Sequence, residues 1–201
     1  MDNRISELKR LIERSQSEIQ GLSSSMGIHH SFHFDQCIEE AALCSLEDEY
    51  SVRLPVQYRE FVTSIGNGGG QPLNGMFTVE QSLSLFRCRI LDGTKAPFAD
   101  ELFADCWFLE VDEGMSFSPQ MPEGEEQQMV DGNGVLTFAY LPETRLHCAV
   151  VMEGEHKDSV IYYSDSIERK VKYTGKTFLD WWIAYYEHIL KNLPVYSYIS
   201  L

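Results

Sequence analysis

Positive charge is missing from the middle of this sequence, which has no lysine or arginine between Ala96 and Thr144. Over all 201 residues, 31 Asp and Glu outnumber 16 Lys and Arg, so the formal net charge is −15. A surface of this sign repels nucleic acid and anionic membranes and attracts a basic partner. The charge therefore argues against nucleic-acid binding, although acidic residues also simply keep a protein soluble.

Long apolar runs and a disulfide pattern are missing as well. No stretch approaches the roughly 20 apolar residues that cross a bilayer, and the N-terminus is charged and amphipathic, unlike a secretory signal. Five widely spaced cysteines are atypical of a disulfide framework. We therefore expect a cytoplasmic protein without membrane contact. Its cysteines should be reduced and mostly buried, and they are Cys37, Cys44, Cys88, Cys106 and Cys148.

The segment from Leu54 to Gly70 carries its own helix start and stop signals. Proline suits the first position of a helix, because its missing N–H would have no partner there, so we expect Pro55 to open the helix. Glycines permit the positive φ of a helix end and a sharp reversal. The segment thus predicts a short helix that ends in a tight turn. Its inward stripe is Tyr58, Phe61, Val62 and Ile65, and its turn is Asn67, Gly68, Gly69 and Gly70.

The spacing of apolar residues predicts three further helices, over residues 3–20, 35–50 and 177–192. Asp35 has a short carboxylate that can cap the second, which should turn Ile38, Ala42 and Leu46 inward. A serine-rich connector from residue 21 to 27 separates an N-terminal helix and linker, residues 1–27, from a body formed by residues 28–201. The N-terminal helix either packs on the body or swings free.

Six short runs of β-branched and aromatic residues predict strands. Their short connections favour antiparallel neighbours, because parallel pairs need a long crossover. Helices first, strands in the middle and a helix last predict an α+β fold. The six runs are residues 75–79, 83–90, 107–111, 135–140, 148–152 and 160–163.

Several motifs follow one another in an order that is typical of a known protein family. The helix before Leu54 carries Glu39, Glu40, Leu43, Leu46 and Glu47, and the last helix opens with Thr177-Phe178-Leu179-Asp180-Trp181-Trp182. Ala149–Val151 and Val160–Tyr163 look like a last strand pair, with Asp158 and Ser159 where a glycine is usual. Together the motifs resemble the SUKH superfamily, whose members are largely bacterial immunity proteins that neutralise polymorphic toxins, with relatives among fungal cell-wall assembly regulators.

The resemblance spans roughly residues 35 to 193 and implies a SUKH-like fold, a curved antiparallel sheet packed against N-terminal and C-terminal helices. Its motifs are structural rather than catalytic. The structural motif residues are Leu54, Pro55, Tyr58, Phe61, Asn67, Gly68, Gly69, Gly70, Phe178 and Trp181.

Candidate reactive groups each have a plainer explanation. The glycine run follows a helix, whereas a phosphate-binding loop precedes one. His29, His30 and His33 lie near Asp35 and could hold a metal, but a connector histidine cluster is more often solvated. His147 and Cys148 are adjacent on a predicted strand, so their side chains should point to opposite faces.

Glu110 and Asp112 could pair for acid–base chemistry on one strand face, yet they equally suit a solvated strand end. We therefore expect no enzyme, no cofactor and no bound metal. A metal-dependent hydrolase that uses the early histidines is the least favoured alternative.

The sequence favours a binding protein. The first hypothesis is an immunity protein that occludes the basic active-site surface of a toxin, such as a nuclease. The second is a non-enzymatic regulatory scaffold, in which the N-terminal helix recruits a partner. For the first, the predicted partner-binding residues are Glu110, Asp112, Glu113, Glu123, Glu125, Glu126, Trp107 and Phe117.

Overall fold

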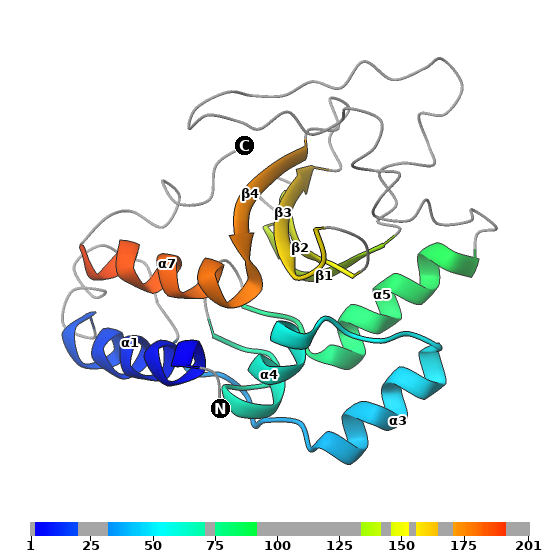
Figure 1. The fold of residues 1–201 in the computed structure, drawn as a ribbon, viewed down its shortest axis with the longest axis horizontal. Coiled ribbons are helices and arrows are strands. Elements are labelled where there is room, and N and C mark those ends of the chain that lie inside the picture. The colour runs from blue at the N-terminus through cyan, green and yellow to red at the C-terminus, as the bar shows by residue number, and fades with distance from the viewer. Residues whose placement is uncertain are drawn as a thin grey trace.

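A computed structural model describes residues 3–19, 32–70, 75–91, 134–141, 146–152, 156–164 and 171–191. Its helices are α1 (Asn3–Ile19), α3 (Glu40–Tyr50), α4 (Val56–Ser64), α5 (Val79–Leu91) and α7 (Phe178–Leu190). Its strands are β1 (Val135–Leu141), β2 (Leu146–Val151), β3 (Ser159–Ser164) and β4 (Val171–Thr177). The strands form one antiparallel sheet in the order β1-β2-β3-β4, and helices flank it (Figure 1). The fold is α+β, as the sequence predicts.

The predicted helix after Leu54 is α4, and its inward stripe is confirmed, with Tyr58, Phe61 and Val62 buried and Ile65 partly buried. Pro55 stands one position earlier than predicted. It is the N-cap residue, with an extended ψ of 143°, and its carbonyl oxygen accepts the N–H of Arg59 at 3.0 Å. The prediction was wrong here because a residue that precedes a helix also tolerates a missing N–H.

Three of the strand predictions, all after residue 134, are correct. Residues 135–140, 148–152 and 160–163 correspond to β1, β2 and β3. The pair β2–β3 is not the last one, however, because β4 adds a further antiparallel strand beside β3. Residues 107–111 lie outside the described part of the chain.

Two other strand predictions are wrong. Residues 83–90 belong to α5, in which Val79, Ser82 and Leu83 are buried at helical spacing. Residues 75–79 form no strand, although Met76 makes isolated bridges to Gly69 and Ala139 and thereby connects the glycine turn to β1.

α3 begins at Glu40, five residues later than predicted, and Asp35 does not cap it. The preceding segment is extended instead, because its backbone pairs with the end of α4 and the glycine turn. The N–H of Asp35 donates to Gly68 O at 2.9 Å, and the N–H of Ile38 donates to Val62 O at 3.0 Å. In the shifted helix Ala42 is exposed rather than inward.

The core is built around the aromatic face of α7. Phe178 packs against the rings of Tyr58, Phe61 and Phe138, with centroids 5.1 to 5.4 Å apart, and so joins α4 to the sheet. Trp181 Nε1 donates to the hydroxyl of Tyr162 on β3 at 2.5 Å. The predicted role of the last helix as the cover of the sheet is therefore confirmed (Figure 1).

The N-terminal helix α1 lies along α7, on the side of α7 away from the sheet (Figure 1). Its apolar residues Ile5, Leu8, Leu11 and Ile12 are buried and belong to the main core cluster. Of the two alternatives for this helix, packing on the body is the one observed. None of the described helices is both long and apolar enough to cross a lipid bilayer.

Candidate functional site

The acidic patch and aromatic anchors predicted from the sequence fall between residues 92 and 133, outside the described residues. They stay a prediction. This applies to Glu110, Asp112, Glu113, Glu123, Glu125, Glu126, Trp107 and Phe117.

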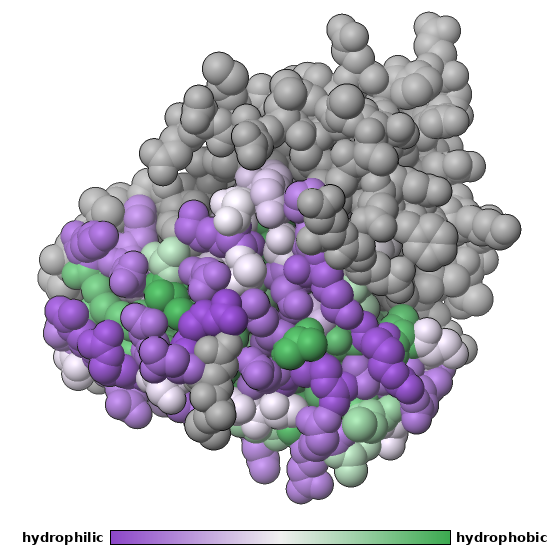
Figure 2. Space-filling model, viewed as in Figure 1, coloured by the Kyte–Doolittle hydropathy of each residue, from purple (hydrophilic) through white to green (hydrophobic). Residues whose placement is uncertain are grey.

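A second concentration of acid lies within the described chain, around α3. Residues 35–80 contain eight acidic and two basic side chains, a formal charge of −6. Six of the acids are exposed and come from the segment before α3, from α3 itself and from the first turn of α5. We call these six the α3 surface: Asp35, Glu39, Glu40, Asp48, Glu49 and Glu80. Hydrophilic residues cover much of this side of the molecule (Figure 2).

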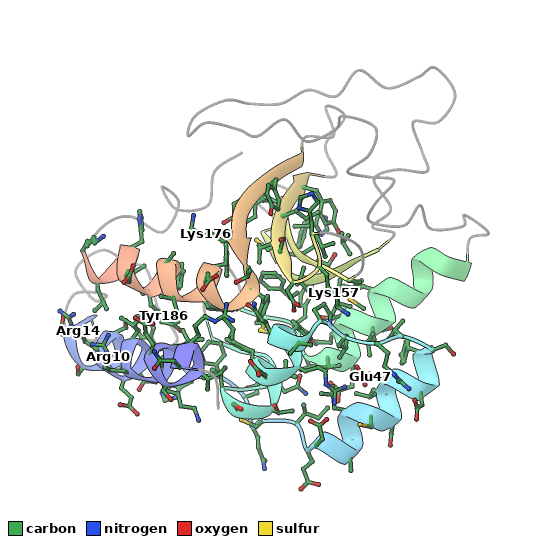
Figure 3. All side chains as sticks on the ribbon, in the orientation of Figure 1. Arg10, Arg14, Glu47, Lys157, Lys176 and Tyr186 are labelled. Carbon is green, nitrogen blue, oxygen red and sulfur yellow. The ribbon has the colours of Figure 1, made fainter. Side chains whose placement is uncertain are left out.

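A partly buried ion pair holds α3 in place. Glu47 is only 2% exposed, on the inner side of α3, and its carboxylate contacts the Arg59 guanidinium of α4. The other carboxylate oxygen accepts the backbone N–H of Leu54 at 2.7 Å. One buried carboxylate thus fixes the Leu54-Pro55 turn and the distance between α3 and α4 (Figure 3). Hydrogen bonding to Glu47 raises the pKa of Arg59 further above its usual range.

Both basic residues in this region are engaged by carboxylates. Arg59 also contacts Glu40, and Arg53 lies 2.9 Å from Asp48. Neither cation is therefore available to offset the remaining acids. Asp48 and Glu49 stand in the last turn of α3, where no basic residue is present and where the helix dipole disfavours negative charge. The α3 surface can therefore attract a cationic partner. The position of Asp48 and Glu49 at the C-terminal end of α3 lowers the stability of that helix.

The glycine turn next to this surface is structural. The N–H of Gly69 donates to Met76 O at 3.0 Å, and the N–H of Gly70 donates to His33 O at 2.6 Å. Asn67 Oδ1 accepts the N–H of Val79 at 2.8 Å at the start of α5. The amides of Gly69 and Gly70 are thus already bonded within the fold, and neither is free to bind a phosphate.

The early histidines do not form a described site. His33 is exposed on the segment before α3, while His29 and His30 lie outside the described residues. Within the described ranges there is no group of three His, Cys, Asp or Glu side chains placed to hold a metal ion.

The described cysteines are less buried than predicted, while the side chains of Cys88 and Cys106 lie outside the described part of the chain. Of the three described thiols, all free, only Cys148 is buried, whereas Cys37 is half-buried and Cys44 is exposed. The prediction failed for two of them because Cys37 precedes α3 and Cys44 lies on its outer side. Burial raises the pKa of the Cys148 thiol well above its usual range, which disfavours the reactive thiolate form. Its neighbour His147 instead stacks between Tyr140 and Tyr163, with ring centroids 4.5 Å from each.

One shallow groove of about 240 Å³ lies between α1, residues 32–34 and the end of α4. Its lining is more polar than apolar and combines Lys9, Glu13, Gln16, His33 and Ser64 with Ile12, Phe32, Phe34 and Ile65. Its volume is below the roughly 300 to 1,000 Å³ of most small-molecule sites. The groove is therefore a feature of the surface and not a candidate active site.

Comparison with known proteins identifies no relative, so the function has to be inferred from the charge and contacts described above. No family model and no curated protein matches the chain.

Glu47 and Arg59 are the residues of this site whose role sequence reasoning missed. A signal was present, because Glu47 stands one helical turn after the buried Leu43, on the inner stripe of α3. A carboxylate at an inward position requires a hydrogen-bonding or charged partner. The identity of that partner, 12 residues further along the chain, depends on how α3 and α4 pack.

Proposed function

We propose that the protein is an immunity protein that binds a basic polymorphic toxin, such as a nuclease, and blocks substrate access to it. The observation that carries this proposal is the uneven negative charge, which is concentrated in residues 96–144 and again on the α3 surface. The resemblance of the Leu54 to Gly70 and Phe178 to Trp182 motifs to SUKH proteins supports it independently.

The proposed mechanism has two stages and no chemical step. The negative field first steers a cationic surface toward the protein, which raises the association rate at low ionic strength. Close packing of a small apolar patch surrounded by polar contacts then retains the complex. Residues 35–80 contain more carboxylates than arginines, and both arginines are already paired. The α3 surface is therefore negative before the partner binds, and no side chain has to move to make it so.

The test measures association with a catalytically inactive form of the toxin encoded beside the gene. Reversing two acids of the α3 surface, Glu39→Lys with Glu80→Lys, should lower the association rate constant by about tenfold or more at low salt. Reversing Glu110 and Asp112 tests the patch predicted from the sequence in the same way. The difference from the unaltered protein should shrink as salt is added, because screening removes long-range attraction.

A matched control separates a local surface from the total charge. Glu13→Lys with Glu187→Lys, on the exposed sides of α1 and α7, changes the net charge by the same amount. This variant should associate nearly as fast as the unaltered protein. Equal rates for all three charge-reversed variants and the unaltered protein would reject the electrostatic mechanism.

The regulatory scaffold is the second candidate, and the observation that favours it is the outer face of α1. Lys9 and Arg10 are exposed there, and Figure 3 labels Arg10 on α1. Deletion of the helix is a poor test, because Ile5, Leu8, Leu11 and Ile12 belong to the core. Lys9→Ala with Arg10→Ala alters only the outer face. If this variant loses its cellular partner but still protects against the toxin, the two functions are separate.

A further inference from the structure

Both faces of the sheet are buried, and only one of them belongs to the main core. Along β2, Leu146, Cys148 and Val150 belong to the main core cluster, whereas Ala149 and Val151 are fully buried outside it. Successive residues of a strand point to opposite faces, so the two sets lie on different sides of the sheet. We call the side outside the main cluster the second sheet face. Its buried residues are Val135, Thr137, Ala149, Val151, Ile161 and Tyr163.

The second sheet face is a continuous and mainly apolar surface. Ala149 of β2 lies opposite both Thr137 of β1 and Ile161 of β3. The hydroxyls of Thr137 and Tyr163 form a hydrogen bond of 2.7 Å within the face, so these polar groups need no partner from outside. None of the six buried residues is charged. Burial of such a surface requires an apolar cover, as in sheets that are packed on both sides.

The described helices pack on the other face. α7 contacts the main core through Trp181, which bonds to Tyr162, and through Phe178, which packs on Phe138. The buried apolar residues of α1, α3, α4 and α5 belong to the same main cluster, and α1, α4 and α7 lie together on one side of the sheet (Figure 1). Among the helical side chains that the structure describes, none therefore supplies the cover of the second sheet face.

The chain between α5 and β1 matches the cover that this face requires. It continues from α5, which contacts β1, and it ends beside Val135, whose buried side chain belongs to the second sheet face. Its apolar residues are densest between Leu102 and Val111, in the sequence Leu-Phe-Ala-Asp-Cys-Trp-Phe-Leu-Glu-Val. An extended stretch of ten residues spans about 33 Å, whereas four strands side by side are only about 15 Å wide. This stretch is thus long enough to cross the whole face.

The alternation of side chains in this stretch gives it one apolar side. In an extended segment Trp107, Leu109 and Val111 point one way, and Glu110 and Asp112 point the other way. The second sheet face has no buried cation that could pair with a carboxylate. Because an unpaired carboxylate is costly to bury, the face accepts the apolar side of the stretch.

We propose that residues 102–111 lie across the second sheet face, with Trp107, Leu109 and Val111 against it, and form a second apolar core with it. In this arrangement Glu110 and Asp112 point to solvent, where a basic partner can reach them. Trp107 is then a core residue and not the partner anchor that the sequence predicts. The docking of this stretch does not depend on the proposed immunity function.

Thiol labelling at two adjacent positions of β2 tests the docking. Val150 and Val151 are both fully buried, Val150 in the main core and Val151 on the second sheet face. Each is changed to cysteine in the full chain together with Cys148→Val, so that β2 carries one thiol. Trp107→Ser with Leu109→Ser should accelerate labelling of the Val151→Cys variant at least about tenfold, because the second face loses its cover. Labelling of the Val150→Cys variant should stay unchanged.

Two control variants identify the covering segment. Glu110→Ser with Asp112→Ser alters the outer side of the same stretch and should leave labelling slow at both positions. Tyr196→Ser with Tyr198→Ser alters the chain after α7 and should also leave it slow. No toxin is added, so the result is independent of the immunity proposal, which the association measurement tests separately.

A second measurement uses the unaltered protein. Nuclear Overhauser contacts should connect the indole protons of Trp107 to methyl groups of Val151 or Ile161. The proposal is wrong if these contacts are absent, if labelling at residue 151 does not respond to Trp107→Ser with Leu109→Ser, or if the variant altered after α7 accelerates it instead.

A milder variant separates loss of the cover from general unfolding. If Trp107→Ser with Leu109→Ser accelerates labelling equally at residues 150 and 151, Leu109→Ala by itself should still accelerate it only at residue 151. Equal acceleration at both positions in that variant, or none at residue 151, would overturn the proposal.

Discussion

Asp158 and Gln57 connect the first turns of two helices. Asp158 Oδ1 accepts the backbone N–H of Gln57 at 3.0 Å at the start of α4, and Gln57 Oε1 accepts the N–H of Leu179 at 3.0 Å at the start of α7. The carbonyl oxygen of Asp158 also accepts the N–H of Phe178 at 2.7 Å. Asp158 achieves this with a φ of 69°, in the left-handed region that glycine usually occupies. Asp is one of the few residues besides glycine that enter this region routinely, and here its side chain is held by Gln57.

Substitutions at Asp158 should separate two contributions to stability, the hydrogen-bond acceptor of its side chain and the strain of its left-handed backbone. Asp158→Gly keeps the left-handed conformation and loses only the acceptor, so unfolding should become easier by about 1 kcal/mol. Asp158→Ala adds the strain of a left-handed Cβ, and about 2 to 3 kcal/mol should be lost. Asp158→Asn keeps both properties and should stay within about 0.5 kcal/mol. Urea unfolding measures all three, and equal losses for Gly and Ala would contradict the strain argument.

Two glycines of nearly equal φ allow the destabilisation caused by steric overlap of an added Cβ to be measured apart from the backbone strain. Gly70 has φ 63° and lies against the Phe34 ring, where an added Cβ would stand only 2.3 Å from Cε1, whereas Gly175 has φ 66° and open space around it. Gly175→Ala should cost only backbone strain, about 1 to 2 kcal/mol. Gly70→Ala should cost about 1 to 3 kcal/mol more, because the aromatic core must shift. Similar midpoints in thermal unfolding for the two variants would show that the ring adjusts freely.

The Glu47–Arg59 pair should be far more important to stability than the exposed pair beside it. Glu47→Ala leaves the Leu54 N–H and the Arg59 guanidinium without their buried acceptor, so about 3 kcal/mol of unfolding free energy should be lost. Asp48→Ala removes an exposed contact with Arg53 and should cost less than about 1 kcal/mol. Chemical denaturation at low and high salt is the measurement. Comparable losses for both variants would mean that Glu47 is not the residue that holds α3 on α4.

Alkaline solution should unfold the protein through its buried phenols and thiol. Burial raises the pKa values of Cys148, Tyr58, Tyr185 and Tyr186 above their ordinary values of 9.0 for the thiol and 10.0 for the phenols. Below those ordinary values both states keep their protons, and stability is unaffected. Above them the unfolded chain loses protons that the folded chain retains, so stability falls by about 1.4 kcal/mol per pH unit for each group.

The melting temperature between pH 7 and 11 measures this loss. Cys148→Val removes the group that titrates first, so the decline should begin about one pH unit later in this variant. A melting temperature that stays constant to pH 11 would contradict the burial of these groups.

The helix α5 shows how local patterns compete. Leu83 to Ile90 alternates apolar and polar residues well enough to predict a strand, yet the segment is helical. A helix-start signal was present in Thr78-Val79-Glu80-Gln81: Thr78 Oγ1 accepts the N–H of Gln81 at 3.3 Å, and Gln81 Oε1 accepts the N–H of Thr78 at 2.9 Å. This reciprocal capping box favours a helix in a segment whose apolar periodicity fits a helix and a strand equally well.

The strand β4 shows the opposite case, in which little local signal exists. Val171 to Thr177 is short, contains a glycine and two lysines, and reads as a polar connection. It becomes a strand because the last open edge of β3 pairs with it, through Ile161 opposite Tyr173 and Tyr163 opposite Val171. The unpaired N–H and C=O groups of a strand edge form hydrogen bonds with whichever segment the topology brings beside them.

The sequence by itself determined α4, its glycine turn, the strands β1 to β3 and the aromatic α7, because capping residues and apolar periodicity act over a few positions. Only the tertiary structure decided that Glu47 pairs with Arg59, that Asp158 serves both α4 and α7, and that α1 covers Tyr186. These relationships join residues from 12 to more than 100 positions apart. They depend on how whole elements pack, and no short-range pattern in the chain encodes that.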